Sequence, residues 1–176
     1  MLTIESGLTE HVSVTTSVTS SSPPVAAPVP PSATPMPPED MDRWAHLWFR
    51  LVRHPWTSLA LVPGDASTSM LDAARRLAEV ASQYQGETVH LLNAQRIGSA
   101  DLGVAMGALA ERALPGSRVL LIVASPLIQP AAIPLARAAD GAVLVVRLGQ
   151  TRTADARRTL ACVGQAGFLG SITLTA

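Results

Sequence analysis

The feature that most constrains the fold is a regular alternation of short apolar runs with helical patterns. The runs, rich in aliphatic and β-branched residues, lie at 58–62, 88–92, 118–124, 142–146 and 171–174. The helical patterns between them lie at 69–84, 100–114, 130–138 and 153–166. Such unbroken runs are typical of strands covered on both faces, and strand–helix alternation favours right-handed parallel crossovers. We therefore expect a three-layer α/β domain, with helices on both faces of a mainly parallel sheet of about five or more strands.

The first 38 residues differ in composition from this alternating region. Residues 13–38 consist largely of Ser, Thr, Val, Ala and Pro, without periodicity, and they hold most of the 14 prolines. Such a segment buries too little apolar surface to offset its ordering entropy. We interpret 1–38 as a disordered arm. A proline-rich ligand for a partner domain is the alternative, although no basic residue lies beside the prolines.

Residues 39–57 are predicted to form an amphipathic helix and a linker, with Pro55 ending the helix. Apolar side chains at helical spacing form one stripe, which consists of Trp44, Leu47, Trp48, Leu51 and Val52. The stripe has three interpretations: packing on the domain's own core, a partner or self-association surface, or an anionic membrane surface. The last would use the basic residues of the helix, which are Arg43, Arg50 and Arg53.

Charge and cysteine content exclude several classes of function. The 13 basic residues, all of them Arg, are balanced by 13 acidic ones, so the formal net charge is zero. A neutral chain is poorly suited to nucleic acid, and chemistry that needs a lysine is excluded. Cys162 is the single cysteine and the four histidines are dispersed, so we predict no metal site. No run approaches the roughly 20 apolar residues of a membrane span, and we expect a cytoplasmic protein.

Three stretches carry motifs of a known family. The stretch LWFRLVR at 47–53 is similar to an oligomerisation helix of the form E-x-x-R-x-x-R, with Leu47 in place of the glutamate. PGDASTS at 63–69 is similar to P-G-E-G-K-[ST]-[ST], and ARAADGAVLVVRLGQT at 136–151 to A-D-G-V-[IL]-L-V-V-R-x-G-x-T. The chain thus resembles the deviant-Walker P-loop ATPases of the MinD/ParA group, above all the cytoplasmic domain of bacterial tyrosine autokinases of capsule and exopolysaccharide export. The resemblance implies that 58–176 is a degenerate P-loop ATPase-like domain.

The phosphate-binding segment of this family has changed at its chemical positions. In a working P-loop, backbone N–H groups and a lysine hold the phosphates and a hydroxyl holds Mg²⁺. Here Ser67 stands at the lysine and Ala66 at a glycine. Asp65 would repel phosphates if it faced them. Thr68 and Ser69 keep their hydroxyls, which we interpret mainly as helix caps.

The other chemical positions have changed as well. The resemblance places Asn93 and Gln95 at a paired-aspartate motif, and Val123 at the Walker B aspartate. Losing the lysine and three carboxylates together leaves no phosphoryl-transfer machinery. We therefore expect no catalytic residue and no cofactor. The degenerate nucleotide site would consist of Gly64, Asp65, Ser67, Thr68, Ser69, Asn93, Gln95 and Val123.

What the resemblance implies is an inactive scaffold or regulatory subunit of a bacterial capsule, exopolysaccharide or cellulose system. Its partner would be a membrane-associated synthase or exporter component, or an active paralogue, and a homodimer is also implied. Recruitment by the partner would bring the chain to the inner face of the cell membrane. Two alternatives stay open: a nucleotide-binding switch or weak ATPase, and a MinD/ParA-like positioning or secretion adaptor. The candidate interface residues are Trp44, Leu47, Trp48, Arg50, Leu51 and Arg53.

Overall fold

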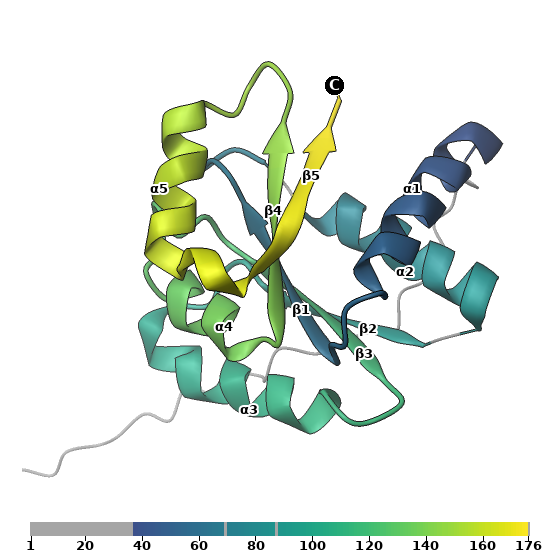
Figure 1. Cartoon of the computed structure of the whole chain (residues 1–176). Coiled ribbons are helices and arrows are strands. Elements are labelled where there is room, and N and C mark those ends of the chain that lie inside the picture. The colour runs from purple at the N-terminus through teal and green to yellow at the C-terminus, as the bar shows by residue number, and fades with distance from the viewer. Residues whose placement is uncertain (1–36, 69, 87, 176) are drawn as a thin grey trace, which may run out of the picture.

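The computed structural model describes residues 37–68, 70–86 and 88–175. Their strands form one five-stranded sheet in the order β2-β3-β1-β4-β5, and every pairing is parallel. Helices lie on both faces of this sheet (Figure 1). The expected three-layer α/β architecture is confirmed for this part of the chain. The arm expected at 1–38 falls almost entirely outside the described residues.

The structure also sets the limits of each element. In chain order they are α1 (Pro38–Leu51), β1 (Ser58–Pro63), α2 (Leu71–Gln85), β2 (Val89–Ala94), a 3-10 turn (Ser99–Asp101), α3 (Leu102–Arg112), β3 (Arg118–Val123), α4 (Ala132–Ala138), β4 (Gly141–Arg147), α5 (Thr153–Val163), a 3-10 turn (Gln165–Gly167) and β5 (Phe168–Leu174). None of the described helices has the length and apolar character that crossing a membrane requires.

The last helix ends and the last strand begins earlier than the expected ranges 153–166 and 171–174. The helix stops at Val163 because Gly164 has φ +100° and ψ 123°, a conformation that only glycine adopts easily. A short 3-10 turn follows, and β5 already begins at Phe168 rather than at residue 171. β5 is therefore a strand of seven residues.

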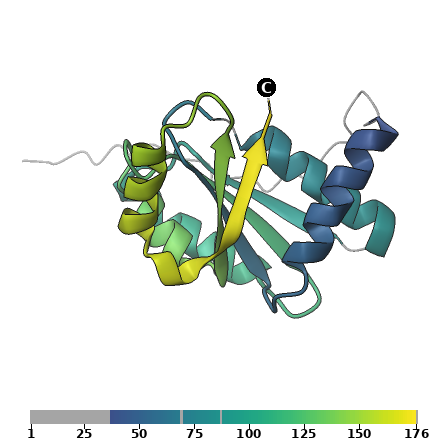
Figure 2. The same cartoon turned by 45° about the horizontal axis from the view of Figure 1, so that its top comes forward.

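The direction of each crossover decides which face its helix covers. The connection through α2 runs from β1 towards one edge of the sheet, whereas those through α3, α4 and α5 run in the opposite direction. Right-handed crossovers therefore place α2 on one face and the other three helices on the opposite face. α1 packs beside α2, so the two share a layer (Figure 2).

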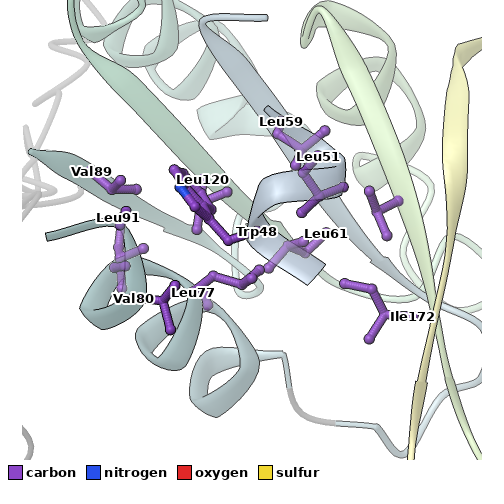
Figure 3. Close-up of a cluster of buried hydrophobic side chains, with 14 of the residues drawn as sticks. Trp48, Leu51, Leu59, Leu61, Leu77, Val80, Val89, Leu91, Leu120 and Ile172 are labelled. Carbon is purple, nitrogen blue, oxygen red and sulfur yellow. The ribbon is translucent and has the colours of Figure 1, made fainter. Parts of the chain in front are cut away.

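The core beneath α1 and α2 is built on Trp48, which is completely buried (Figure 3). It contacts Trp56 edge-on, with ring centroids 5.8 Å apart, and its Nε1–H donates to Oε1 of Gln85 at 2.7 Å. The guanidinium of Arg118 lies 4.5 Å from the ring centroid of Trp56. Truncating a buried tryptophan costs about 3–5 kcal/mol, so α1 is an integral part of the domain.

The opposite face of the sheet is packed with smaller side chains. Its buried alanines come from three strands and two helices: Ala60, Ala94, Ala105, Ala132, Ala136 and Ala142. Because alanine side chains fill little volume, close packing on this face requires the helices to lie near the sheet. The two faces thus differ: one is aromatic and bears the additional helix α1, and the other is rich in alanine.

Candidate functional site

The topology places a candidate site at the carboxyl end of β1. α2 leaves β1 towards one face, whereas α4 and α5 leave the neighbouring strands β3 and β4 towards the other. Ligands of open parallel α/β sheets bind in the crevice that such diverging connections create. Two loops follow the strands at this end: the loop after β1, residues 64–70, and the loop after β4, residues 148–152.

Gly64 brings the loop after β1 into contact with β4. Its N–H donates to the carbonyl oxygen of Val145 at 2.8 Å. A Cβ at this position would lie 3.1 Å from Cγ2 of Thr151, 3.1 Å from Cγ1 of Val146 and 3.2 Å from the Val145 oxygen. Any larger residue would have to displace these neighbours, so glycine keeps the two loops together.

Asp65 turns its carboxylate back onto the loop that carries it. Its Oδ1 accepts the backbone N–H groups of Ser67 and Thr68 at 2.8 and 2.9 Å, and the hydroxyls of the same residues at 2.8 and 3.0 Å. Its Oδ2 accepts the Thr68 hydroxyl at 2.9 Å and also the hydroxyl of Thr151 from the loop after β4. Only 8% of Asp65 is exposed. The carboxylate is therefore surrounded by donors.

These donors keep Asp65 ionised although it is buried. Burial raises the pKa of this carboxyl, but the hydrogen bonds from Thr151, Ser67 and Thr68 lower it to about 2. At neutral pH the loop thus carries a fixed negative charge. The backbone N–H groups of Ser67 and Thr68, which are the kind of donor that cradles a phosphate, already bind an anion of the same chain.

The structure assigns the hydroxyls of the loop a different role from helix capping. Thr68 is buried and its hydroxyl donates to Asp65, while α2 begins after Met70 without any side-chain cap. The expected capping role was therefore wrong for Thr68, because Met70 and not Thr68 holds the N-cap position of α2. Ser69, the other expected cap, lies outside the described residues. Ser67, which the resemblance places at a lysine position, is exposed, and its hydroxyl also donates to Asp65.

The remaining site positions lie at the ends of the next two strands. Asn93 is exposed in β2, and its Oδ1 accepts the N–H of Gln95 at 3.1 Å, which forms a local turn. Val123 is completely buried at the end of β3. Among the described residues, no three His, Cys, Asp or Glu side chains lie close enough together to hold a metal ion. These positions close turns and fill the core.

The stripe of α1 packs mainly on the domain itself. Trp48 and Leu51 are core residues, and as packed here neither is accessible to a partner. Trp44 and Leu47 are half-buried against the same core. Of the candidate interface residues, the two arginines of the family motif, Arg50 and Arg53, are exposed.

Sequence reasoning missed Thr151 and Asp140. Thr151 also accepts the N–H of Arg147 at 2.9 Å, and it ties the loop after β4 to Asp65. Asp140 precedes β4 and accepts four hydrogen bonds from Thr57 and Ser58 at the start of β1. Both residues match fixed letters of the family motif compared with 136–151, and this match was the available signal.

The comparisons with known proteins add no relative. No protein-family model matches the sequence, and no curated protein is significantly similar to it.

Proposed function

We propose that this chain is a catalytically inactive P-loop ATPase-like scaffold or regulatory subunit that acts by protein–protein interaction in a bacterial polysaccharide synthesis or export system. The carboxylate of Asp65 is the observation that supports the proposed lack of catalytic activity. It accepts the N–H groups of Ser67 and Thr68, which a bound phosphate would need. A phosphate entering this loop would meet a buried negative charge instead of a lysine.

The unfavourable free energy of placing a phosphate beside this charge is large compared with typical free energies of ligand binding. Removing one charge contact to a transferring phosphoryl group costs several kcal/mol. The chain has no lysine to offer, and the other metal-binding positions of the family hold Asn93, Gln95 and Val123. Binding and hydrolysis of a nucleotide are thus disfavoured together.

The polysaccharide system and the partner follow from the family resemblance. We infer a membrane-associated synthase or exporter component, or an active paralogue, as the partner, with the chain in the cytoplasm and recruited to the membrane by that partner. The exposed part of α1 supplies a contact surface, because Arg50 and Arg53 point away from the core that Trp48 and Leu51 fill.

Calorimetric titration tests whether the chain binds a nucleotide. We expect no heat of binding when the full chain is titrated with ATP, ADP or cyclic dinucleotides in the presence of Mg²⁺, and no release of phosphate. A positive control is built by restoring the family loop with Asp65→Glu, Ala66→Gly and Ser67→Lys. This variant should bind ATP but not hydrolyse it, since the carboxylates of the other strands are still missing. Binding by the native chain would support the nucleotide-switch alternative.

Affinity purification from native cells tests the partner. The double variant Arg50→Glu, Arg53→Glu changes exposed charges at the end of α1 and just after it, and Arg157→Glu, Arg158→Glu makes the same change on the exposed part of α5. We expect a polysaccharide synthase or exporter component to copurify with the native chain and the α5 variant, and to be lost from the α1 variant. Retention by both variants would exclude the α1 surface, and recovery of a cell-positioning or secretion system would favour the adaptor alternative.

A further inference from the structure

Two exposed aromatic side chains lie together on the surface of the molecule. Phe49 of α1 is 41% exposed and Tyr84 of α2 is 45% exposed. Their rings contact each other edge-on, with centroids 5.9 Å apart. The two helices that carry them form the outer layer on one side of the sheet (Figure 1). Exposed apolar surface that gathers in one place, rather than being scattered, marks a contact site.

Basic side chains lie beside this aromatic pair. Arg50 and Arg53 are exposed at the end of α1 and just after it, and so are His46 and His54. Arg50 follows Phe49 directly in the sequence, and Arg53 lies about one helical turn further along. We refer to Phe49, Tyr84, Arg50 and Arg53 as the aromatic–basic patch.

Acidic residues are missing from this part of the chain. Residues 43–64 hold three of the 13 arginines and none of the 13 acidic residues. The exposed end of α2, residues 82–86, is uncharged. Along the two helices, the acidic residues that most closely precede the aromatic pair are Asp42 and Glu79, each more than one turn away. Asp140, at the amino end of β4, is held by the start of β1. A chain with no net charge thus has a local positive surface.

The occupant of the aromatic–basic patch must offer negative charge beside apolar groups. A bilayer with anionic lipids offers both at two depths, with phosphates at its surface and acyl chains below. Aromatic rings favour the boundary between these two regions, and an arginine side chain can lie along apolar surface while its guanidinium stays at the phosphates. The exposed faces of two outer helices are also accessible to a planar surface.

We propose that the aromatic–basic patch binds directly to the surface of an anionic lipid bilayer. Phe49 and Tyr84 enter the boundary between headgroups and acyl chains, and Arg50 and Arg53 contact the lipid phosphates. The proposal holds whether or not the chain has the protein partner proposed above, because vesicles that contain no protein test it.

The binding should be weak and should depend on lipid charge. One arginine near an anionic surface strengthens binding roughly fivefold, so two give a preference on the order of 25-fold for anionic over neutral lipid. Salt weakens this attraction, since charges are screened over about 8 Å at physiological ionic strength. Stable attachment to a membrane takes two such contacts. The patch would therefore support recruitment by a partner and not replace it.

Cosedimentation of the full chain with lipid vesicles tests the proposal. The vesicles consist either of phosphatidylcholine alone or of equal parts of phosphatidylcholine and phosphatidylglycerol. At roughly 0.1 M salt we expect the partition coefficient to be at least about tenfold larger for the anionic vesicles, and at roughly 1 M salt we expect this preference to disappear.

The contribution of the arginines is located by a pair of matched variants. Arg50→Glu, Arg53→Glu should abolish the preference for anionic vesicles. Arg157→Glu, Arg158→Glu makes the same change of net charge at exposed positions of α5 and should keep most of the preference.

A second pair of variants locates the contribution of the aromatic rings. Phe49→Ser, Tyr84→Ser should lower binding to anionic vesicles about tenfold, because less apolar surface enters the bilayer. Leu114→Ser, Ile128→Ser removes two other apolar side chains, which are 56% and 65% exposed, and should leave the binding unchanged.

Each other outcome overturns the proposal. Equal binding to both kinds of vesicle, or binding to neither, would exclude a charge-dependent lipid contact and leave the patch to a protein. Equal losses in the α1 and α5 variants would mean that net charge alone governs binding. Binding that survives both patch variants would place the lipid contact elsewhere in the chain. A loss in the arginine variant alone would exclude entry of the aromatic pair into the bilayer.

Discussion

The two ends of the β1–β4 strand pair are each closed by an aspartate, and the two aspartates differ in burial. At the amino ends, Oδ2 of Asp140 accepts the N–H groups of Thr57 and Ser58 at 2.9 Å and their hydroxyls at 2.7 and 3.0 Å. At the carboxyl ends, Asp65 gathers a similar set of donors, but it is buried whereas Asp140 is exposed. The same chemistry thus serves both ends of the sheet.

The difference in partners shows what each aspartate does. Asp140 bonds residues 82 and 83 positions away, so it fixes two strands side by side where the topology creates no ligand crevice. Asp65 bonds mostly its own loop, at the end of the sheet where parallel α/β sheets generally bind ligands. We therefore interpret Asp140 as a clamp between strands and Asp65 as an internal substitute for a bound anion.

The largest expected effect comes from removing the buried aspartate. Asp65→Ala should lower the free energy of unfolding by about 3 kcal/mol, because buried N–H and hydroxyl donors lose a charged acceptor. Urea unfolding measures this. Asp42→Ala, which removes an exposed carboxylate from α1, is the control and should change stability by less than about 0.5 kcal/mol. Equal effects of the two variants would contradict the role assigned to Asp65.

The fold was largely predictable from the sequence, whereas the chemistry of the site was only partly so. Apolar runs such as 118–124 correspond closely to buried strands, because a strand covered on both faces needs an unbroken apolar run. That the chain contains no lysine could also be read directly. The inward turn of Asp65 could not, since its distant partner Thr151 lies 86 positions away and only the folded sheet brings the two together.

The next largest effect is expected in acid. The pKa of Asp65 is lowered from 3.8 to about 2, so its stabilisation is complete above the unfolded value and is lost as the pH falls from about 4 to 2. The shift corresponds to roughly 2 kcal/mol. Unfolding free energies at pH 5 and pH 2.5 should therefore differ less in Asp65→Asn than in the native chain. An identical loss in both would mean that Asp65 does not titrate as inferred.

Removing Asp140 should destabilise the fold less than removing Asp65. The donors of Thr57 and Ser58 also lower the pKa of Asp140, although burial raises it. Protonation of Asp140 therefore contributes to the same loss of stability in acid. Because Asp140 is exposed, water can replace its hydrogen bonds, and Asp140→Ala should cost only about 1 kcal/mol. Amide exchange at Thr57 and Ser58 should accelerate, which locates the change. A cost as large as that of Asp65→Ala would show that burial is not what distinguishes the two ends.

The smallest expected effect is also the one that separates a clamp from an anion substitute. If Asp65 stands in for an anion, Asp65→Ala leaves N–H groups of Ser67 and Thr68 that an external anion can use, and weak binding stabilises the folded state by mass action. Sulfate at about 20 mM should then raise the unfolding midpoint of this variant by roughly 2 °C relative to chloride of equal ionic strength. The native chain and Asp140→Ala provide the baseline for the general effect of sulfate on folding. A rise in Asp65→Ala alone would mean that the loop keeps the shape of a phosphate site, and that in the native chain the Asp65 carboxylate occupies the place of the phosphate. An equal rise in all three proteins would reduce Asp65 to a second structural clamp.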